Sequence, residues 1–384
     1  MNIQFIVRIF GLWVLLGHAG TAQWLPQQIP NDATMLLSID FATANIGAAS
    51  GYSAPQLAFT GRAVFTTDGG LHWSLCQVPD SARSLVTTVM LNDTLGYIAG
   101  AYNVRGNANS TTNVPPALAS PVIENARSIQ RLSHARIGLS GNDPYRGYFL
   151  KTTNGGRHWF PFGSLPDSTS YLIGAFFVSE VVGYLTASDQ FGTGSAVILK
   201  TTTGGLTWSR FRPPIRIFSL RNIVFTDSLH GAAVGSRDSG TTAVGVIVST
   251  STGGATWTTQ DYTSVAGLED ICFSNSSTGF MVGTNQQFHP VVAKTTDGGV
   301  TWTEQVWGDT ASLFGVRFAP GTGTGIAFGN QLKYDSLGFY RATDVYVLRT
   351  TDNGATWVRQ IVTSPTASSI TTSGILLSPM DGYL

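Results

Sequence analysis

The octapeptide Thr295-Thr296-Asp297-Gly298-Gly299-Val300-Thr301-Trp302 decides the fold, because close copies of it recur along the chain. Successive tryptophans of these copies lie 45 to 55 residues apart, except for one longer interval between Trp73 and Trp159. A period near fifty residues is the size of one four-stranded propeller blade. The six copies are TTDGGLHW (66–73), TTNGGRHW (152–159), TTTGGLTW (201–208), TSTGGATW (250–257), TTDGGVTW (295–302) and TTDNGATW (350–357).

The sequence between the copies also repeats. An alternating apolar run, such as residues 246–248, precedes each octapeptide, and earlier in each unit two short apolar runs flank a polar turn and a glycine, as in 223–235. Alternation of apolar and polar residues bounded by turn residues is typical of strands. Each unit therefore predicts an inner strand a, a strand b, a variable loop, a strand c, the octapeptide turn and a strand d that begins at the tryptophan.

The chain ends predict one more unit. A seventh a–b pair starts near Ile370 and runs to Leu384, and Trp24-Leu25 resembles the start of a strand d. We therefore expect an all-β protein, a seven-bladed β-propeller of four-stranded antiparallel blades, closed by pairing of the two chain ends. Strand c and the octapeptide of the last blade are missing, so we expect that blade to be incomplete and the reading frame to be truncated. The alternative is a natural end with a defective closing blade.

The octapeptide has the composition of a tight turn. Its paired glycines can take a positive φ, and Asp, Asn or Thr at its third position can accept hydrogen bonds from backbone N–H groups. Thr203 and Thr252 replace the acid in two copies, which favours a structural acceptor over a catalytic carboxylate. The residues expected to form these turns are Asp68, Trp73, Asn154, Trp159, Trp208, Trp257, Asp297, Trp302, Asp352 and Trp357.

Residues 1–22 are typical of a secretory signal peptide. Arg8 precedes a short apolar run, and Gly20-Thr21-Ala22 offers small residues for cleavage before Gln23. An uncleaved anchor is the alternative, but the run is short for a bilayer, which needs about 20 residues. We expect no later membrane span, one propeller domain over 23–384, and a secreted, periplasmic or cell-surface location.

Composition narrows the classes of partner and cofactor. The formal net charge is +0 and only 11% of residues are charged, which argues against nucleic acid. Cys76 and Cys272 lack the paired spacing of a metal or redox motif, and we interpret them as separate thiols, with a disulfide or a nucleophile as the alternative. The histidines show no metal-ligand spacing, so neither a metal nor another cofactor is expected.

The octapeptide resembles the Asp-box, or BNR repeat, with the pattern Ser/Thr-x-Asp-x-Gly-x-Thr-Trp. Over residues 24–384 the chain resembles secreted BNR-repeat propellers similar to the photosystem II assembly and stability factor family. The motif is shared with sialidases, sortilin-type receptors and xyloglucan-degrading enzymes, so the resemblance implies the fold more strongly than a function. In these families the box lies at the blade periphery, away from the working face.

The variable material falls in the b–c loops, and the largest insertion spans 101–147. These loops should meet on the face opposite the octapeptides, where loops on a rigid scaffold commonly carry binding groups. Arg83, Arg221, Asp270 and Arg317 near the inner strands could line the central channel. The candidate binding residues are Tyr102, Arg105, Arg131, His134, Tyr145, Arg146, Arg237, Asp238, Tyr340 and Arg341.

The sequence favours a monomeric binding or assembly scaffold for a protein or a carbohydrate over an enzyme. The alternative is a glycoside hydrolase of the sialidase or xyloglucanase type. Residues 211–214, Phe-Arg-Pro-Pro, faintly resemble the sialidase Phe-Arg-Ile-Pro motif, but they follow the third octapeptide rather than precede the first. Because no paired carboxylates tied to an arginine cluster stand out, we expect no catalytic residue. Two carboxyl groups about 5–9 Å apart in the channel mouth would favour the hydrolase.

Overall fold

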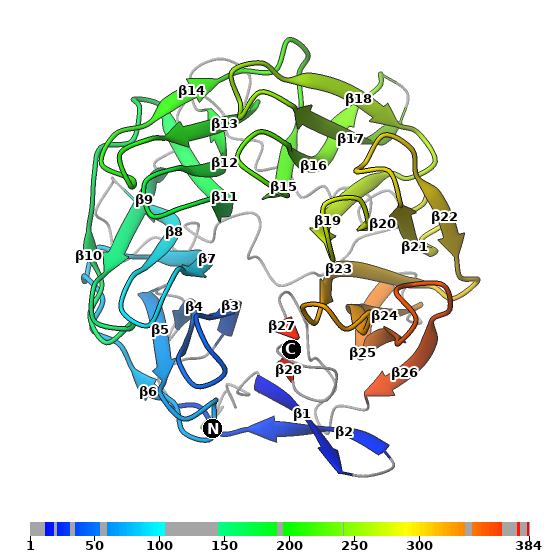
Figure 1. Cartoon of the computed structure of the whole chain (residues 1–384), viewed down its shortest axis with the longest axis horizontal. Helices are drawn as coiled ribbons and strands as arrows, with labels where there is room; N and C mark the ends of the chain where they lie inside the picture. Colours follow the sequence, from blue (N-terminus) through cyan, green and yellow to red (C-terminus); the bar gives the residue numbers. More distant parts are fainter. Residues whose placement is uncertain are drawn as a thin grey trace, which may run out of the picture.

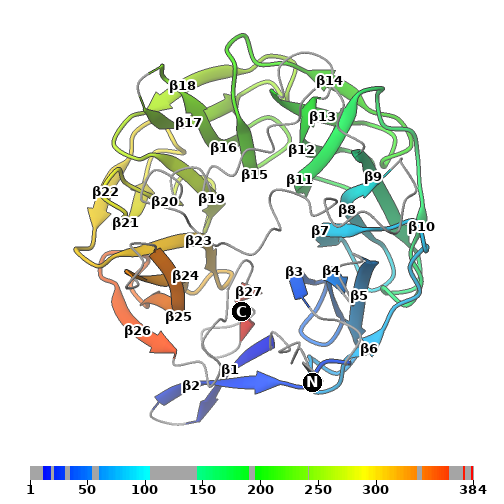
Figure 2. The same ribbon diagram turned by 180° about the vertical axis from the view of Figure 1, so that it is seen from behind.

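The computed structural model describes residues 12–18, 21–30, 35–53, 60–103, 145–189, 195–240, 242–334, 340–362, 375–376 and 382–383. All elements in these ranges are strands, and Figure 1 shows them as sheets arranged in a ring around a common centre. The view from behind in Figure 2 shows the same ring, with the inner strands of successive blades facing its centre. The all-β propeller prediction is confirmed.

Six sheets are blades of four consecutive antiparallel strands, ordered from the channel outward. The strands of blades 1 to 3 are β3 (Met35–Phe41), β4 (Gly47–Ser53), β5 (Thr60–Thr66), β6 (Ser74–Leu75); β7 (Ser84–Met90), β8 (Gly96–Asn103), β9 (Tyr145–Thr152), β10 (Phe160–Pro161); and β11 (Thr169–Phe177), β12 (Gly183–Asp189), β13 (Ala196–Thr201), β14 (Ser209–Phe211). Those of blades 4 to 6 are β15 (Ser219–Phe225), β16 (Gly231–Asp238), β17 (Ala243–Thr250), β18 (Thr258–Tyr262); β19 (Gly267–Phe273), β20 (Gly279–Thr284), β21 (Pro290–Thr295), β22 (Thr303–Val306); and β23 (Ala311–Phe318), β24 (Gly325–Tyr334), β25 (Tyr340–Thr350), β26 (Val358–Val362).

The prediction of seven blades is wrong, because the structure has six four-stranded antiparallel blades of the repeating kind. The chain ends form a sheet of different construction, in the order β2-β1-β28-β27. It contains no octapeptide, and β27 (Ile375–Leu376) and β28 (Gly382–Tyr383) have two residues each. The N-terminal segment contributes β1 (Leu12–His18) and β2 (Thr21–Gln27), where only one outer strand was expected.

Every octapeptide lies between the third and fourth strands of its blade. In blade 5, Gly298 and Gly299 have φ of 76° and 93°. The Thr295 hydroxyl accepts from Gly299 N at 2.9 Å, and Asp297 Oδ1 accepts from Thr301 N at 2.9 Å. In blade 3 the Thr203 hydroxyl takes the place of the carboxylate and accepts from Thr207 N at 3.0 Å. A hydroxyl therefore suffices for the turn, because what the turn needs at this position is a hydrogen-bond acceptor.

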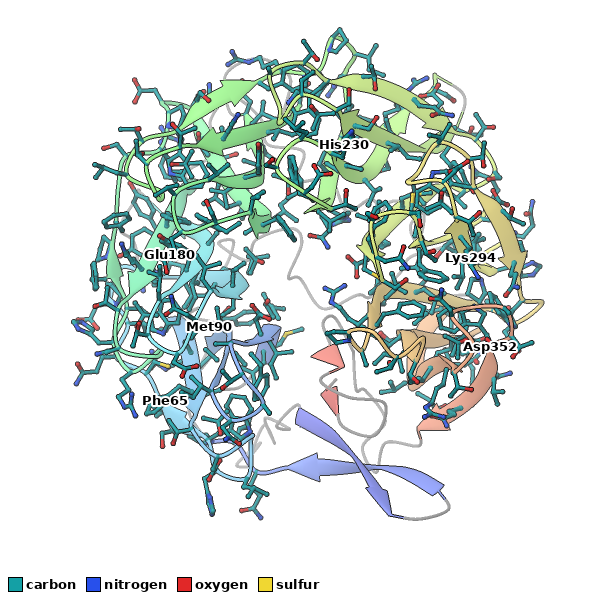
Figure 3. All side chains as sticks on the ribbon, viewed as in Figure 1. Phe65, Met90, Glu180, His230, Lys294 and Asp352 are labelled. Atoms are coloured by element: carbon teal, nitrogen blue, oxygen red, sulfur yellow. The ribbon has the colours of Figure 1, made fainter. Side chains whose placement is uncertain are left out.

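The turns also join neighbouring blades. Tyr184 Oη of blade 3 and Lys200 Nζ of the same blade donate to Gly253 O in the blade 4 octapeptide, at 2.7 and 2.6 Å. Lys294 Nζ of blade 5 donates to Asn353 O of blade 6 at 2.6 Å, and Figure 3 shows Lys294 and the neighbouring Asp352 in these adjacent blades. Each such bond satisfies a turn carbonyl with a donor from the preceding blade.

The core lies between the blades. Tyr97 of β8, Phe149 of β9, Phe177 of β11 and Trp208 form one cluster across blades 2 and 3. The Tyr97 and Phe177 rings stack with centroids 4.4 Å apart, and Trp208 meets Phe149 edge-on at 5.2 Å. Stacked and edge-on aromatic pairs bury large areas in favourable geometry, so the blade faces are joined by apolar packing as well as by the turns.

The first strand of each blade, which faces the centre of the ring, shares one irregularity with the others. Each carries a register shift near its start, for example between Leu220 and Asn222 and between Leu268 and Asp270. In blade 4 the residue of strand b opposite the shift is a glycine because the packing is close: a Cβ on Gly235 would lie 1.8 Å from Ser219 O. The extra residues, Arg221 and Glu269 in blades 4 and 5, are only partly buried on the channel-side strands.

Candidate functional site

Two of the predicted binding residues lie together at the loop end of blade 2. Tyr102 near the end of β8 is the ladder partner of Arg146 near the start of β9. Both side chains are half-buried, and both line a cavity of about 400 Å³. The ladder brings them together because the insertion between β8 and β9 leaves from one strand and returns on its neighbour.

The cavity lies between blade 2 and the connection from β10 to β11. Its volume is within the range of about 300–1,000 Å³ of typical ligand pockets. We call it the Tyr102–Arg146 pocket, and its lining is Tyr102, Arg146, Gly147, Tyr148, Phe149, Pro161, Phe162, Gly163, Leu165, Pro166, Asp167, Ser168 and Thr169.

One wall of the pocket is aromatic. The Tyr102 and Tyr148 rings have centroids 5.5 Å apart at an interplanar angle of 57°. The Tyr148 hydroxyl is 2.9 Å from Ser81 Oγ, and burial raises the pKa of this phenol against the opposing effect of that hydrogen bond. The phenol therefore stays neutral at physiological pH. Phe162 is packed beneath Lys151 Nζ, which lies 4.4 Å from its ring centroid.

Residues 166–169 form the polar wall of the pocket, and a cluster of charged side chains lies behind them. Asp189, at the end of β12, is 3% exposed and receives Arg212 Nε at 2.7 Å and Ser168 Oγ at 2.6 Å. Arg210 Nη1 lies 3.8 Å from its Oδ1. Burial alone raises the pKa of the Asp189 carboxyl, but the hydrogen bonds from Ser168 and Arg212 and the two arginine charges outweigh burial and hold that pKa below its usual value. The carboxylate is thus ionised and fully engaged.

This cluster also shows what the Phe-Arg-Pro-Pro segment does. The guanidinium of Arg212 binds Asp189 through both Nε and Nη2, the latter at 2.5 Å. A sialidase requires arginines that face the substrate carboxylate, whereas Arg212 is committed to a carboxylate of its own chain. The arginine of the Phe-Arg-Pro-Pro segment therefore has a structural role, as the partner of Asp189.

The described lining of the pocket holds no pair of carboxylates of the kind a glycosidase needs. Among the described lining residues, Asp167 is the only acid. Retaining and inverting glycosidases need two carboxyl groups about 5–9 Å apart. The described ranges also contain no group of three or more His, Cys, Asp or Glu placed to hold a metal, and no helix suited to crossing a membrane.

The inner strands hold a second group of charges. Arg221 Nε of β15 lies 3.3 Å from Glu269 Oε2 of β19. The adjacent Asp270, 2% exposed, accepts from Val316 N at 2.9 Å and from Arg317 of β23. Two consecutive carboxylates of blade 5 therefore join it to blades 4 and 6. Arg221, Asp270 and Arg317, which the sequence placed near the channel, act here as a structural network.

Of the other predicted residues, Arg237 and Asp238 are described and lie outside the lining of the pocket. Arg237 lies in β16 of blade 4 and donates to Asp261 Oδ1 at 2.6 Å, and Asp238 Oδ1 accepts from Gly240 N at 2.8 Å. Tyr145 begins β9, and Tyr340 and Arg341 begin β25, paired with Tyr334 and Lys333 of β24. The strands β16 and β17, and likewise β24 and β25, extend into the variable b–c segments in which these residues were predicted. Arg105, Arg131 and His134 lie outside the described residues.

The half of the pocket that comes from the β10–β11 connection was not predicted from the sequence. Phe162, Asp167 and Ser168 were not candidates, because only b–c loops were considered. Pro161 and Pro166 could have indicated that this connection takes a fixed course, since proline restricts the backbone.

Comparison with known proteins supports the fold. No protein-family model matches the chain, and no curated protein matches it. The structure is similar to that of YCF48 from Cyanidioschyzon merolae, at 14% identity and a TM-score of 0.53, covering 89% of each chain. It is also similar to a structure of YCF48 bound to D1 peptide, at 14% identity and a TM-score of 0.51, covering 94% of this chain and 91% of the other. A GH74 enzyme from Niastella koreensis matches at 13% identity and a TM-score of 0.41, covering 90% of this chain and 61% of that one.

Proposed function

We propose that the protein is a secreted, monomeric binding propeller that holds a peptide segment of a protein partner in the Tyr102–Arg146 pocket. The observation that carries the proposal is the pocket itself, which joins four aromatic rings and an arginine with a single carboxylate in its described lining. Aromatic residues and arginine are the side chains most enriched at binding hot spots.

The comparison of folds is consistent with a peptide-binding role. A propeller of similar architecture is described as bound to D1 peptide. At 14% identity this likeness concerns the fold, so the proposal rests on the chemistry of the pocket lining. We further propose that the octapeptides are Asp-boxes and that residues 23–384 belong to one propeller domain.

Selection from a random library tests the binding function. Purified wild-type protein is used to select from a phage-displayed dodecapeptide library and is applied in parallel to a glycan array. We expect enrichment of peptides, with a dissociation constant that rises about 10- to 30-fold in Tyr102→Ala and in Arg146→Ala, because truncating a hot-spot residue commonly has an effect of this size.

Leu71→Ala is the matched control. Leu71 is 72% exposed on an octapeptide turn of blade 1, away from the pocket, so its replacement should leave peptide affinity unchanged. Enrichment of glycans alone, or peptide binding that survives both pocket substitutions, would overturn the proposal.

Secretion has its own test. Cleavage before Gln23 would remove β1 from the sheet formed by the chain ends. N-terminal sequencing of the protein recovered from its native source should give Gln23 as the first residue. A product that retains residues 1–22 would contradict the processing step.

A further inference from the structure

One turn in the polar wall of the pocket has an unusual backbone. Residues 166–169 form a turn in which Thr169 N donates to Pro166 O at 3.2 Å. Ser168, the third residue of this turn, has a φ of 70°. A positive φ at that position is normally supplied by glycine, because a side chain is strained there. All four residues line the pocket.

The strained turn is held by the buried cluster behind it. Ser168 is 6% exposed and its Oγ donates to Asp189 Oδ1 at 2.6 Å. Arg210 then donates to Ser168 Oγ at 2.9 Å, to Thr169 Oγ1 at 3.0 Å, and to the carbonyl of Asp167. The side chain of Ser168 is therefore clamped between a carboxylate and a guanidinium, and the same guanidinium binds the backbone of the turn.

Asp189 sits behind the pocket and is absent from its lining. It binds the turn through Ser168 Oγ, and its charge also balances Arg210 and Arg212, which approach it from the same blade. Loss of that charge would leave two guanidinium groups next to each other with no carboxylate between them. Like charges at close range repel, so Arg210 would be displaced from the turn.

We propose that Asp189 is a positioning residue of the pocket: through Ser168 and Arg210 it holds the 166–169 turn in its left-handed form and so fixes the polar wall before a ligand arrives. A wall that is already in its bound shape loses less conformational entropy on binding. The proposal rests on the proposed function only for its effect on affinity, since the shape of the turn can be measured in the free protein.

Hydrogen–deuterium exchange of the Thr169 amide tests the positioning role without any ligand. Asp189→Asn should speed exchange at this amide by at least about tenfold, whereas Ser168→Gly alone should change it little, because glycine takes a φ of 70° without strain. In the double variant, Ser168→Gly should restore most of the protection that Asp189→Asn removes. A merely structural role of Asp189 would not be rescued in this way.

Two further variants keep the test decisive. Ser168→Ala leaves the Asp189–Arg212 pair intact but removes Oγ, so it should also speed exchange at Thr169 even if Asp189→Asn fails to fold. Asp261→Asn breaks a comparable pair with Arg237 in blade 4 and should leave Thr169 unaffected. Wild-type exchange in Ser168→Ala, or a double variant as unprotected as Asp189→Asn, would overturn the proposal.

Measurements of peptide affinity distinguish the proposed binding function from the positioning role of Asp189. With the most enriched dodecapeptide as probe, Asp189→Asn should bind about tenfold more weakly, and Ser168→Gly should recover most of that loss. If no peptide binds the wild type, the proposed function fails while the exchange results still decide the role of Asp189. If the peptide binds Asp189→Asn and wild type equally, the positioning role is wrong and the binding function stands.

Discussion

Replacement of Glu269 by glutamine should flatten the dependence of stability on pH. Glu269 lies in the channel wall with a side chain 10% exposed, next to Asp270 and 3.3 Å from Arg221. Burial raises the pKa of its carboxyl from 4.5 to about 7, with Arg221 opposing and Asp270 reinforcing the shift. Glutamine resembles the protonated form and cannot ionise.

The direction of this pH dependence follows from how many protons the folded and the unfolded protein bind. Between pH 4.5 and 7 the folded protein keeps a proton on Glu269 that the unfolded chain has released. Unfolding therefore releases protons, and the free energy of unfolding falls as pH rises through this window. One pKa unit corresponds to about 1.4 kcal/mol, so Glu269 alone removes about 3 kcal/mol between pH 4.5 and 7. Burial also raises the pKa of Asp40 to about 6, which acts in the same direction in both proteins.

Urea unfolding of wild type and Glu269→Gln at intervals from pH 4 to 8 measures this difference. We expect the wild-type free energy of unfolding to decline more steeply by about 3 kcal/mol over the window, with the two proteins closest in stability at the acidic end. Parallel curves would show that Glu269 titrates near its ordinary pKa, and the account of the channel network would be wrong.

The other predictions concern the turns, the core and the thiols. Trp208 is 9% exposed and packs on Phe149 and Phe177, so Trp208→Ala should lower the free energy of unfolding by about 3–5 kcal/mol. Trp302→Ala should lower it less, because Trp302 is only half-buried. Equal losses for the two variants in urea unfolding would contradict this order. Tyr97→Phe removes the hydroxyl that donates to Gly204 O and should cost about 1–2 kcal/mol. Tyr184→Phe should lower the free energy of unfolding less than Tyr97→Phe does, because Lys200 still donates to Gly253 O. A lower melting temperature for Tyr184→Phe than for Tyr97→Phe would contradict the role of these bonds in joining neighbouring blades. Burial raises the pKa of Cys76 to about 12 and that of Cys272 above its usual value. Iodoacetamide, with labelling measured by mass spectrometry, should therefore react slowly with both thiols until the protein unfolds. Rapid labelling of the folded protein would refute this.

The repeating blades were predictable because each octapeptide encodes its own turn. Paired glycines, a third-position acceptor and a tryptophan specify a c–d turn locally, and six copies fix six blades. The seventh blade was inferred from short apolar runs at the chain ends without an octapeptide. The strand β1 was not predicted, and its pairing with β28 joins segments that are far apart in the sequence, which no local pattern specifies.

Half of the pocket was predictable for a related reason. Tyr102 and Arg146 were predicted at the two ends of the 101–147 insertion, and the structure instead places them on the adjacent strands β8 and β9, which extend into that range. The opposite wall depends on the packing of the β10–β11 connection against blade 2 and on Asp189 and Arg210 from blade 3. Sequence spacing does not show which connection of one blade meets which strand pair of another.

Photo-crosslinking from position 102 tests directly whether a peptide binds in the Tyr102–Arg146 pocket. A benzophenone amino acid is placed at Tyr102, and in a matched protein at Leu71, and each is irradiated with the enriched dodecapeptide. We expect a covalent peptide adduct from position 102 that is lost when Arg146→Ala is added, and no adduct from position 71. Equal adducts from both positions, or none from position 102, would contradict binding in the Tyr102–Arg146 pocket.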